Sequence, residues 1–136
     1  IALAKLFCSR VIAVDNDIHA VEMTKRNIIV NKVVRHVKVY RSSGLRGNHL
    51  KSRAKYDLIV ANILFNPIKS LMRSFIQNLS NSGFLILSGL TIKQARQLKE
   101  ISKQFGLKVL VERKEANWAS LLLKRTTPKR AIKLSY

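Results

Sequence analysis

The stretch IVANILFNPIKSL, from Ile59 to Leu71, places an asparagine where a strand pattern ends and a proline where a helix pattern begins. The run YDLIVAN, from Tyr56 to Asn62, is rich in β-branched and apolar residues, which is typical of a buried strand. Asn66 is the expected cap of a helix that has Pro67 at its first position. Six apolar residues follow at helical spacing: Ile68, Leu71, Met72, Phe75, Ile76 and Leu79. The sequence therefore predicts a strand that leads directly into an amphipathic helix.

Further strand patterns occur on both sides of this stretch. RVIAVD (residues 10–15) indicates another buried strand, whereas HVKVY (residues 36–40) alternates as a more exposed strand does. The polar segment that follows, residues 41–55, is predicted to be a loop. After Gly83 the chain restarts as the strand FLILS. The runs LKVLVER and WASLLLKR predict an antiparallel pair joined around residues 115–117, with Trp118 packed in this hairpin.

Two further helices are marked by their caps. Asp17 can cap a helix that runs to about Asn31, and Thr91 with Gln94 has the signature of a capping box for a helix that stops at Gly106. The inner side of the first of these helices is expected to carry Ile18, Val21 and Ile28, with Ala20 as a further candidate. Strands that alternate with helices of this length predict a doubly wound α/β domain, with a mostly parallel sheet covered on both faces and an antiparallel hairpin at its end.

Composition limits what these motifs can mean. A chain of 136 residues with 47% hydrophobic residues suffices for one globular domain with a core. It contains no run of about 18 apolar residues, which argues against a membrane-spanning helix. Cys8 is the single cysteine, so an internal disulfide and a cysteine-based metal cluster are excluded, and the chain suits a reducing cytoplasm. We expect Cys8 to be a small buried residue, and we predict no metal site.

The chain is strongly basic, with 26 Lys and Arg residues against 7 Asp and Glu residues and a net charge of +19. A surface with this charge attracts nucleic acids and acidic partners. The basic residues are spread along the chain, and no Phe or Tyr interleaves with them as a stacking surface for bases would require. We therefore interpret most of the charge as a solvated surface. A nucleic-acid face that makes non-specific RNA contacts is the alternative.

Polar residues collect where strands of the predicted sheet end. Asp15, Asn62 and Ser88 each end a strand pattern, and ligands of open α/β sheets bind beyond these carboxyl ends. Asp15 has two interpretations: it favours the start of the next helix through its charge, or it accepts hydrogen bonds from the vicinal hydroxyls of a ribose. Asn62 either satisfies loop backbone or uses its carboxamide to hold an amine or the polar edge of a cofactor.

Five segments together resemble a known family: VIAVDND, AVEMTKRNIIVN, YDLIVANILFNPIKSL, GFLILSGL and ERKEANWASLLLKR. In this order they are similar to the bacterial methyltransferase family of large-subunit ribosomal protein eleven. The similarity is to the C-terminal part of its class I S-adenosylmethionine-dependent domain, and it covers nearly all of residues 1–125. The resemblance implies S-adenosyl-L-methionine as cofactor and amino groups of that ribosomal protein as substrate. It implies that Asp15 holds the adenosine ribose, and that Asn62 lies beside the cofactor where the methyl group meets the acceptor nitrogen.

The sequence also departs from that family. The first residues, IALAKLF, form a helix pattern that in the family follows the first strand and a glycine-rich loop. The family also has an N-terminal substrate-recognition domain. The absent strand would be the central one, between RVIAVD and YDLIVAN, and without it two buried strands keep unpaired backbone groups. We therefore expect a fragment of a longer cytoplasmic enzyme, with residues 1–125 as a partial methyltransferase domain and residues 126–136 as a basic tail.

Two other functions are compatible with the sequence. One is a methyltransferase for an exocyclic nucleobase amine of RNA or DNA. Relatives that act on nucleobases follow the asparagine with proline and an aromatic residue, whereas Ile63 and Leu64 intervene here before Phe65. The other is an inactive basic fragment that binds RNA through its charge alone, with a steep dependence on salt.

Overall fold

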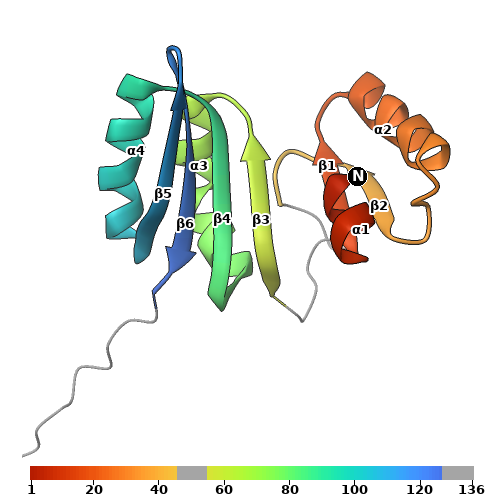
Figure 1. Ribbon diagram of the computed structural model, residues 1–136, viewed down its shortest axis with the longest axis horizontal. Coiled ribbons are helices and arrows are strands. Elements are labelled where there is room, and N and C mark those ends of the chain that lie inside the picture. The colour runs from red at the N-terminus through yellow and green to blue at the C-terminus, as the bar shows by residue number, and fades with distance from the viewer. Residues whose placement is uncertain (46–54, 127–136) are drawn as a thin grey trace, which may run out of the picture. The chain divides into compact units, whose positions relative to one another are not determined.

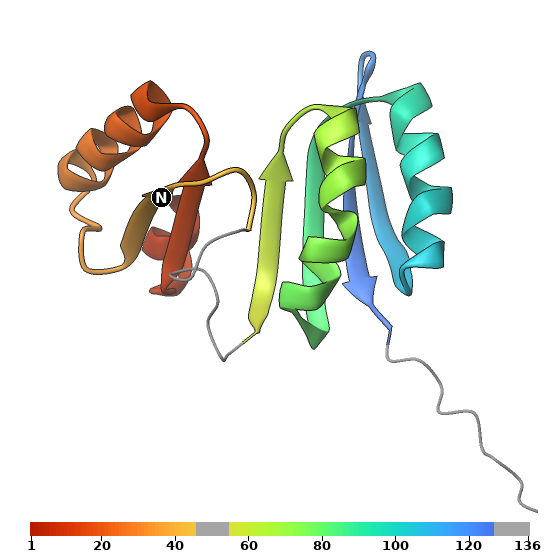
Figure 2. The same cartoon turned by 180° about the vertical axis from the view of Figure 1, so that it is seen from behind.

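The computed structural model describes residues 1–45 and 55–126, and the statements below concern these residues. The chain divides into two compact units, residues 1–52 and 53–136 (Figures 1 and 2). Both units combine strands with helices in the order that the sequence predicts, which confirms the α/β class.

The first unit contains two helices and two strands. Its elements are α1 (Ala2–Phe7), β1 (Val11–Asp15), α2 (Ile18–Val30) and β2 (Val37–Arg41). β1 and β2 pair in parallel, with Val11 opposite Val37 and Asp15 opposite Arg41. Four buried side chains form the core of the unit: Ala4, Ile28, Val33 and Val37. Because Ala4 and Ile28 come from the two helices, Val37 from β2 and Val33 from the connection between α2 and β2, the core holds the helices to the small sheet.

α2 begins where the sequence predicts. The Asp17 carboxylate accepts a hydrogen bond from the backbone N–H of His19 at 2.9 Å, which supplies one acceptor that the first helical turn lacks. Val21 and Ile28 are buried, as expected. Ile18 is 39% exposed, so its predicted place in the core is wrong. Helical side chains tilt toward the N-terminus, and this first residue therefore projects beyond the core.

The second unit is a four-stranded sheet with two helices. Its elements are β3 (Tyr56–Asn62), α3 (Phe65–Asn78), β4 (Leu79–Thr91), α4 (Ile92–Gln104), β5 (Leu107–Glu115) and β6 (Trp118–Arg125). The strand order is β3-β4-β6-β5. β3 and β4 are parallel, whereas β6 is antiparallel to both β4 and β5. The predicted C-terminal hairpin is therefore confirmed.

α3 starts two residues earlier than the sequence predicts. Leu64 is the N-cap in place of Asn66, because its carbonyl accepts a hydrogen bond from the backbone N–H of Ile68 at 3.1 Å. Pro67 therefore occupies the third helical position. The N–H groups of the first turn have no acceptor within the helix, so proline is tolerated there. The buried side of the helix agrees with the prediction at Ile68, Met72 and Phe75.

The ends of β4 and α4 follow from side-chain contacts. β4 begins at Leu79 instead of after Gly83, so Gly83 lies inside the strand. A Cβ at Gly83 would come 2.8 Å from the Cγ of Leu79, so the strand has no room for a side chain there unless Leu79 shifts. The Thr91 hydroxyl accepts from the backbone N–H of Gln94 at 3.3 Å, and the backbone N–H of Thr91 donates to the Gln94 side chain at 2.9 Å. This reciprocal pair confirms the capping box. Gly106, with φ of 69°, follows the end of α4 as predicted.

The helices of the second unit pack on one face of the sheet (Figure 2). Beneath them four leucines are fully buried: Leu85, Leu87, Leu121 and Leu123. On the opposite face, the register places Val60, Ile86, Leu122 and Val111 in a row across all four strands, here called the open-face row. Val60 is 51% exposed and Val111 is 43% exposed. Helices on both faces were predicted, but neither helix of this unit covers the open-face row.

The predicted parallel sheet is present as two separate sheets. In the described part of the chain, β1 pairs with β2 alone and β3 pairs with β4 alone. The resemblance implies a first strand that would pair with both β1 and β3. No strand of the described residues pairs with both β1 and β3.

Cys8 was expected to be buried and Trp118 to pack in the final hairpin, but both side chains are exposed. Cys8 is the C-cap of α1 with φ of 50°, and its side chain is exposed where the chain turns away from the helix. Trp118 is 59% exposed, because it starts β6 directly after the hairpin turn at the end of the sheet. Within the two described ranges, residues 1–45 and 55–126, no helix is long and apolar enough to cross a membrane.

Candidate functional site at the carboxyl ends of the strands

Asn62 is the last residue of β3, at the strand end that the sequence predicts. It pairs in register with Ser88 on β4, so the two polar residues lie side by side. Ser88 was predicted to end its strand, which is wrong, because β4 continues to Thr91. Asn62 is exposed, and its carboxamide has no hydrogen-bond partner among the described residues. Both its N–H donors and its carbonyl acceptor are therefore available to a ligand.

Gly89 belongs to the same site and was not predicted. The pairing of β4 with β6 shifts between Leu87 and Leu90, which marks a β-bulge that contains Ser88 and Gly89. Gly89 has φ of 74°, and a Cβ built on it would lie 2.7 Å from Oδ1 of Asn62. A glycine inside a strand pattern indicates a bulge or a close approach, so LSGL contained a signal for the bulge but not for its contact with Asn62.

Asp15 is the last residue of β1, and its side chain is exposed. Its Oδ1 accepts a hydrogen bond from the backbone N–H of Asp17 at 3.0 Å, which shows that it supports the turn into α2. Oδ2 accepts no hydrogen bond from any residue that the structure describes. Asp15 therefore supports the turn that leads into α2, and its carboxylate still has acceptor capacity for a ligand.

The structure brings together only part of the predicted site. Asn62 and Ser88 are neighbours within the second unit, and Gly89 joins them. Asp15 belongs to the first unit, where Arg41 lies opposite it in the register and donates a hydrogen bond to the backbone carbonyl of Asn16 at 3.1 Å. Each of the two strand ends is therefore a partial site in its own unit.

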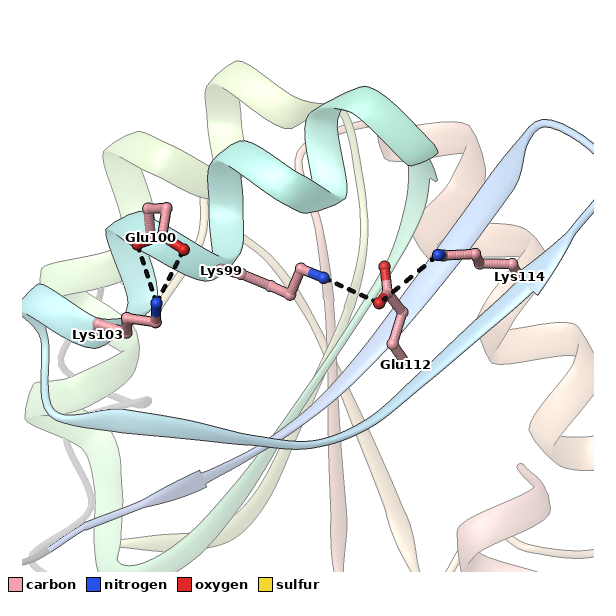
Figure 3. Close-up of polar contacts among 5 residues, drawn as sticks. All are labelled: Lys99, Glu100, Lys103, Glu112 and Lys114. Atoms are coloured by element: carbon pink, nitrogen blue, oxygen red, sulfur yellow. Dashed lines mark hydrogen bonds and ion pairs between the residues drawn. The ribbon is translucent and has the colours of Figure 1, made fainter.

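An open hollow of about 510 Å³ lies elsewhere, between the C-terminal half of α4 and the start of β5. Its charged lining consists of Lys99, Glu100, Lys103 and Lys108. Lys103 pairs with Glu100, and Lys99 pairs with Glu112, each at 2.9 Å (Figure 3). The hydrogen bond from Lys99 holds the pKa of Glu112 below its usual range. These ion pairs compensate much of the charge, and the lining does not include Asn62.

Phe84 lies beside a basic side chain on the neighbouring strand. Phe84 on β4 is paired with Lys124 on β6, whose Nζ lies 5.5 Å from the ring centroid. The ring is 37% exposed. This contact forms because the sheet brings together residues that are far apart in sequence. It does not amount to a stacking surface for bases, so the prediction that no Phe or Tyr interleaves with the basic residues to form one stays a prediction.

Comparison with known proteins identifies the family of the chain. The family model for "Ribosomal protein L11 methyltransferase (PrmA)" matches residues 1–126. The ribosomal protein L11 methyltransferase of Bradyrhizobium diazoefficiens is 34% identical over 125 residues, covering 92% of this chain and 42% of that protein. The corresponding protein of Desulforamulus reducens is 34% identical over 123 residues, covering 90% of this chain and 38% of that one. The chain thus spans less than half the length of these curated relatives.

Solved structures agree at the level of the fold. A ribosomal protein L11 methylase from Lactobacillus delbrueckii subsp. bulgaricus matches with a TM-score of 0.76 and 22% identity, covering 85% of this chain and 57% of that one. A methyltransferase from Pyrococcus furiosus matches with a TM-score of 0.75 and 21% identity, covering 93% of this chain and 68% of that one. Both show the methyltransferase fold. Because the family model spans almost the whole sequence, the chain belongs to the ribosomal protein L11 methyltransferase (PrmA) family.

Proposed function

We propose that this protein transfers methyl groups from S-adenosyl-L-methionine to lysine or terminal amino groups of large-subunit ribosomal protein L11. Family membership and the names of the curated relatives support this activity. The structural observation that carries the proposal is the carboxamide of Asn62, which ends β3 without a hydrogen-bond partner among the described residues. A donor and acceptor pair beyond the end of a parallel strand suits a ligand with an amino group.

Asp15 fits the ribose of this cofactor. Its carboxylate is exposed beyond the end of β1, and Oδ2 has no partner in the described part of the chain. Vicinal hydroxyls donate to such a carboxylate in nucleotide-binding α/β folds. The hydrogen bond from the Asp17 N–H to Oδ1 fixes the orientation of the side chain before any ligand arrives.

Asn62 would align the acceptor amine. The bound cofactor supplies an electrophilic methyl group on its sulfonium. The acceptor amine must be neutral to attack, because its lone pair forms the new bond, and Asn62 cannot serve as the base that removes a proton. Its Oδ1 can accept an N–H of the amine and direct the lone pair, so its contribution is alignment.

The residues after Asn62 suit a lysine side chain. Ile63 is 38% exposed and Leu64 is 76% exposed, and both directly follow the strand end. These apolar groups would border the aliphatic stem of a lysine while Asn62 holds its amino group. Neither side chain is aromatic, so this loop offers no stacking surface to a flipped base.

The proposed function also assigns a role to each part of the chain. Residues 1–125 would form part of one methyltransferase domain of a longer enzyme, followed by a basic tail from residue 126. A chain with one cysteine and a net charge of +19 suits the cytoplasm and the surroundings of the ribosome. Non-specific RNA contact through the basic surface would keep the enzyme near its substrate.

The test uses the complete gene product with methyl-tritiated S-adenosyl-L-methionine. Purified ribosomal protein L11 and ribosomal RNA are offered separately, and the labelled residue is identified after hydrolysis. We expect label in lysine or the terminal amine of L11, and much less with the Asn62→Ala variant. Label in RNA bases would support the nucleobase alternative. RNA binding that falls steeply with salt, without cofactor binding, would support the non-enzymatic alternative.

A further inference from the structure

The bulge in β4 lies next to the polar group that ends β3. Ser88 pairs with Asn62 on one side, while the pairing of β4 with β6 on the other side is interrupted between Leu87 and Leu90. Gly89, inside the interruption, has φ of 74°. The bulge therefore presents the backbone of Gly89, and no side chain, toward the end of β3.

A side chain at position 89 would displace the carboxamide of Asn62. A Cβ on Gly89 would lie 2.7 Å from Oδ1 and 3.8 Å from Cγ of Asn62, with the backbone carbonyl of Ile63 at 3.6 Å. The first distance is shorter than real Cβ contacts, so the carboxamide would have to move. No hydrogen bond from the described residues holds this carboxamide. The carboxamide lies against the bare backbone of Gly89, at a place that a side chain on residue 89 would occupy.

We propose that Gly89 is a positioning residue that places the carboxamide of Asn62 for the acceptor amine. The role rests on the proposed function, because Asn62 is the group that would touch the substrate. A side chain at position 89 would push Oδ1 away from the place where it meets the amine. Alignment is sensitive to such shifts, since a displacement of about 1 Å can cost about 100-fold in rate.

Backbone strain is the competing explanation for a glycine here, and the chain contains a matched control. Gly106 has φ of 69°, almost the same as Gly89, but a Cβ there would meet only Thr126 atoms at 3.7 Å and 3.9 Å, which are ordinary contacts. Gly106→Ala therefore introduces the strain of a left-handed alanine without a clash. Gly89→Ala introduces both the strain and the contact with Asn62.

The first experiment examines geometry without catalysis. The side-chain amide resonance of Asn62 is identified in a ¹⁵N-correlated NMR spectrum by its loss in Asn62→Ala. We expect Gly89→Ala to shift this resonance and Gly106→Ala to leave it in place. If Gly89→Ala does not fold, Gly89→Asn replaces it, because asparagine adopts left-handed backbone more readily. An unmoved resonance in the folded variant overturns the proposal.

The second experiment measures methylation by the complete gene product. We expect Gly89→Ala to lower kcat at least tenfold with little change in cofactor affinity. We expect folded Gly106→Ala to keep the kcat of the unsubstituted protein. In an Asn62→Ala background, Gly89→Ala should cause no further loss of kcat. An equal further loss in that background overturns the positioning role. If the resonance shifts but Asn62→Ala methylates normally, the proposed function of Asn62 fails while the contact with Gly89 stands.

Discussion

The ammonium group of Lys99 on α4 lies 2.9 Å from a carboxylate oxygen of Glu112 on β5 (Figure 3). Lys114 approaches the same oxygen at 3.9 Å. The side chains of Lys99 and Glu112 are only 28% and 20% exposed, so solvent screens this pair less than a surface pair. The contact connects the helix to the edge strand of the second unit, and it makes the stability of that unit dependent on pH.

Glu112→Gln should lower the free energy of unfolding by about 1 kcal/mol at pH 7, because an amide keeps the shape but loses the charge. The Lys99 hydrogen bond lowers the pKa of Glu112, so the stabilisation is fully present above the usual glutamate value of about 4.3. It is lost as pH falls through the lowered pKa of the folded state. Urea unfolding at pH 7, 5 and 3 measures the difference between the two proteins.

Glu100→Gln is the matched control for this prediction. Its ion pair with Lys103 has the same 2.9 Å distance, but the two side chains are 70% and 66% exposed. Exposed pairs of this kind contribute little, so we expect no pH-dependent change. A loss in Glu112→Gln that is equally large at pH 3 and pH 7 would show that packing, and not charge, is responsible.

Ser102→Ala should raise the free energy of unfolding by about 1 kcal/mol. Ser102 on α4 is fully buried, and its hydroxyl has no hydrogen-bond partner among the described residues. Alanine removes this unsatisfied group and also favours the helix. Ser70→Ala on α3 is the control, because Ser70 is exposed and its hydroxyl donates to the carbonyl of Pro67. Thermal unfolding that gives the same change for both variants would contradict the prediction.

Asn62→Ala should reduce turnover much more than it weakens cofactor binding, because only interactions stronger in the transition state raise the rate of the chemical step. Single-turnover methylation of L11, with cofactor affinity measured separately, distinguishes these effects. If cofactor binding is abolished and the remaining rate follows occupancy, Asn62 is a cofactor ligand and the alignment role is wrong.

Asn62→Asp tests the same role through pH. A carboxylate keeps the acceptors but favours the charged form of the incoming lysine, which has no lone pair. The loss of activity should therefore shrink as pH rises toward about 10.4, the ordinary pKa of lysine. A loss that is constant across this range would show that the charge of the amine is not the cause.

Asp15→Ala should weaken S-adenosyl-L-methionine binding by about 1–3 kcal/mol, the usual result of leaving polar partners unmatched. Calorimetric titration of the complete gene product with S-adenosyl-L-methionine measures this change in binding free energy. Asp17→Ala is a useful comparison, because Asp17 caps α2 through His19 and should affect stability more than affinity. An unchanged cofactor affinity in Asp15→Ala would remove this residue from the site.

The sequence was most informative where local chemistry decides the structure. The capping box of Thr91 with Gln94, the cap at Asp17 and the strand end at Asn62 all depend on residues a few positions apart, and all were predicted correctly. The start of α3 was wrong because Asn66 and Pro67 express preferences of about 1 kcal/mol, which the backbone contact of Leu64 overrides.

Contacts across strands were not predictable in the same way. Gly89 meets Asn62, and Phe84 meets Lys124, only because the sheet places their strands in a particular register. A one-residue change in register would turn each side chain to the other face, and one sequence does not fix that register. The positive φ of Gly89 could be suspected from the pattern LSGL, but its contact with the carboxamide could not.

The open-face row also affects how the purified protein will behave in solution. Val60 and Val111 leave apolar surface exposed, and such patches drive aggregation when copies can approach one another. A net charge of +19 keeps the copies apart at low ionic strength. At 1 M salt the screening length falls to about 3 Å, so the repulsion no longer reaches between molecules. Solubility should then decrease as salt is added, although added salt is the usual remedy for a poorly soluble basic protein. Val60→Lys should restore the solubility.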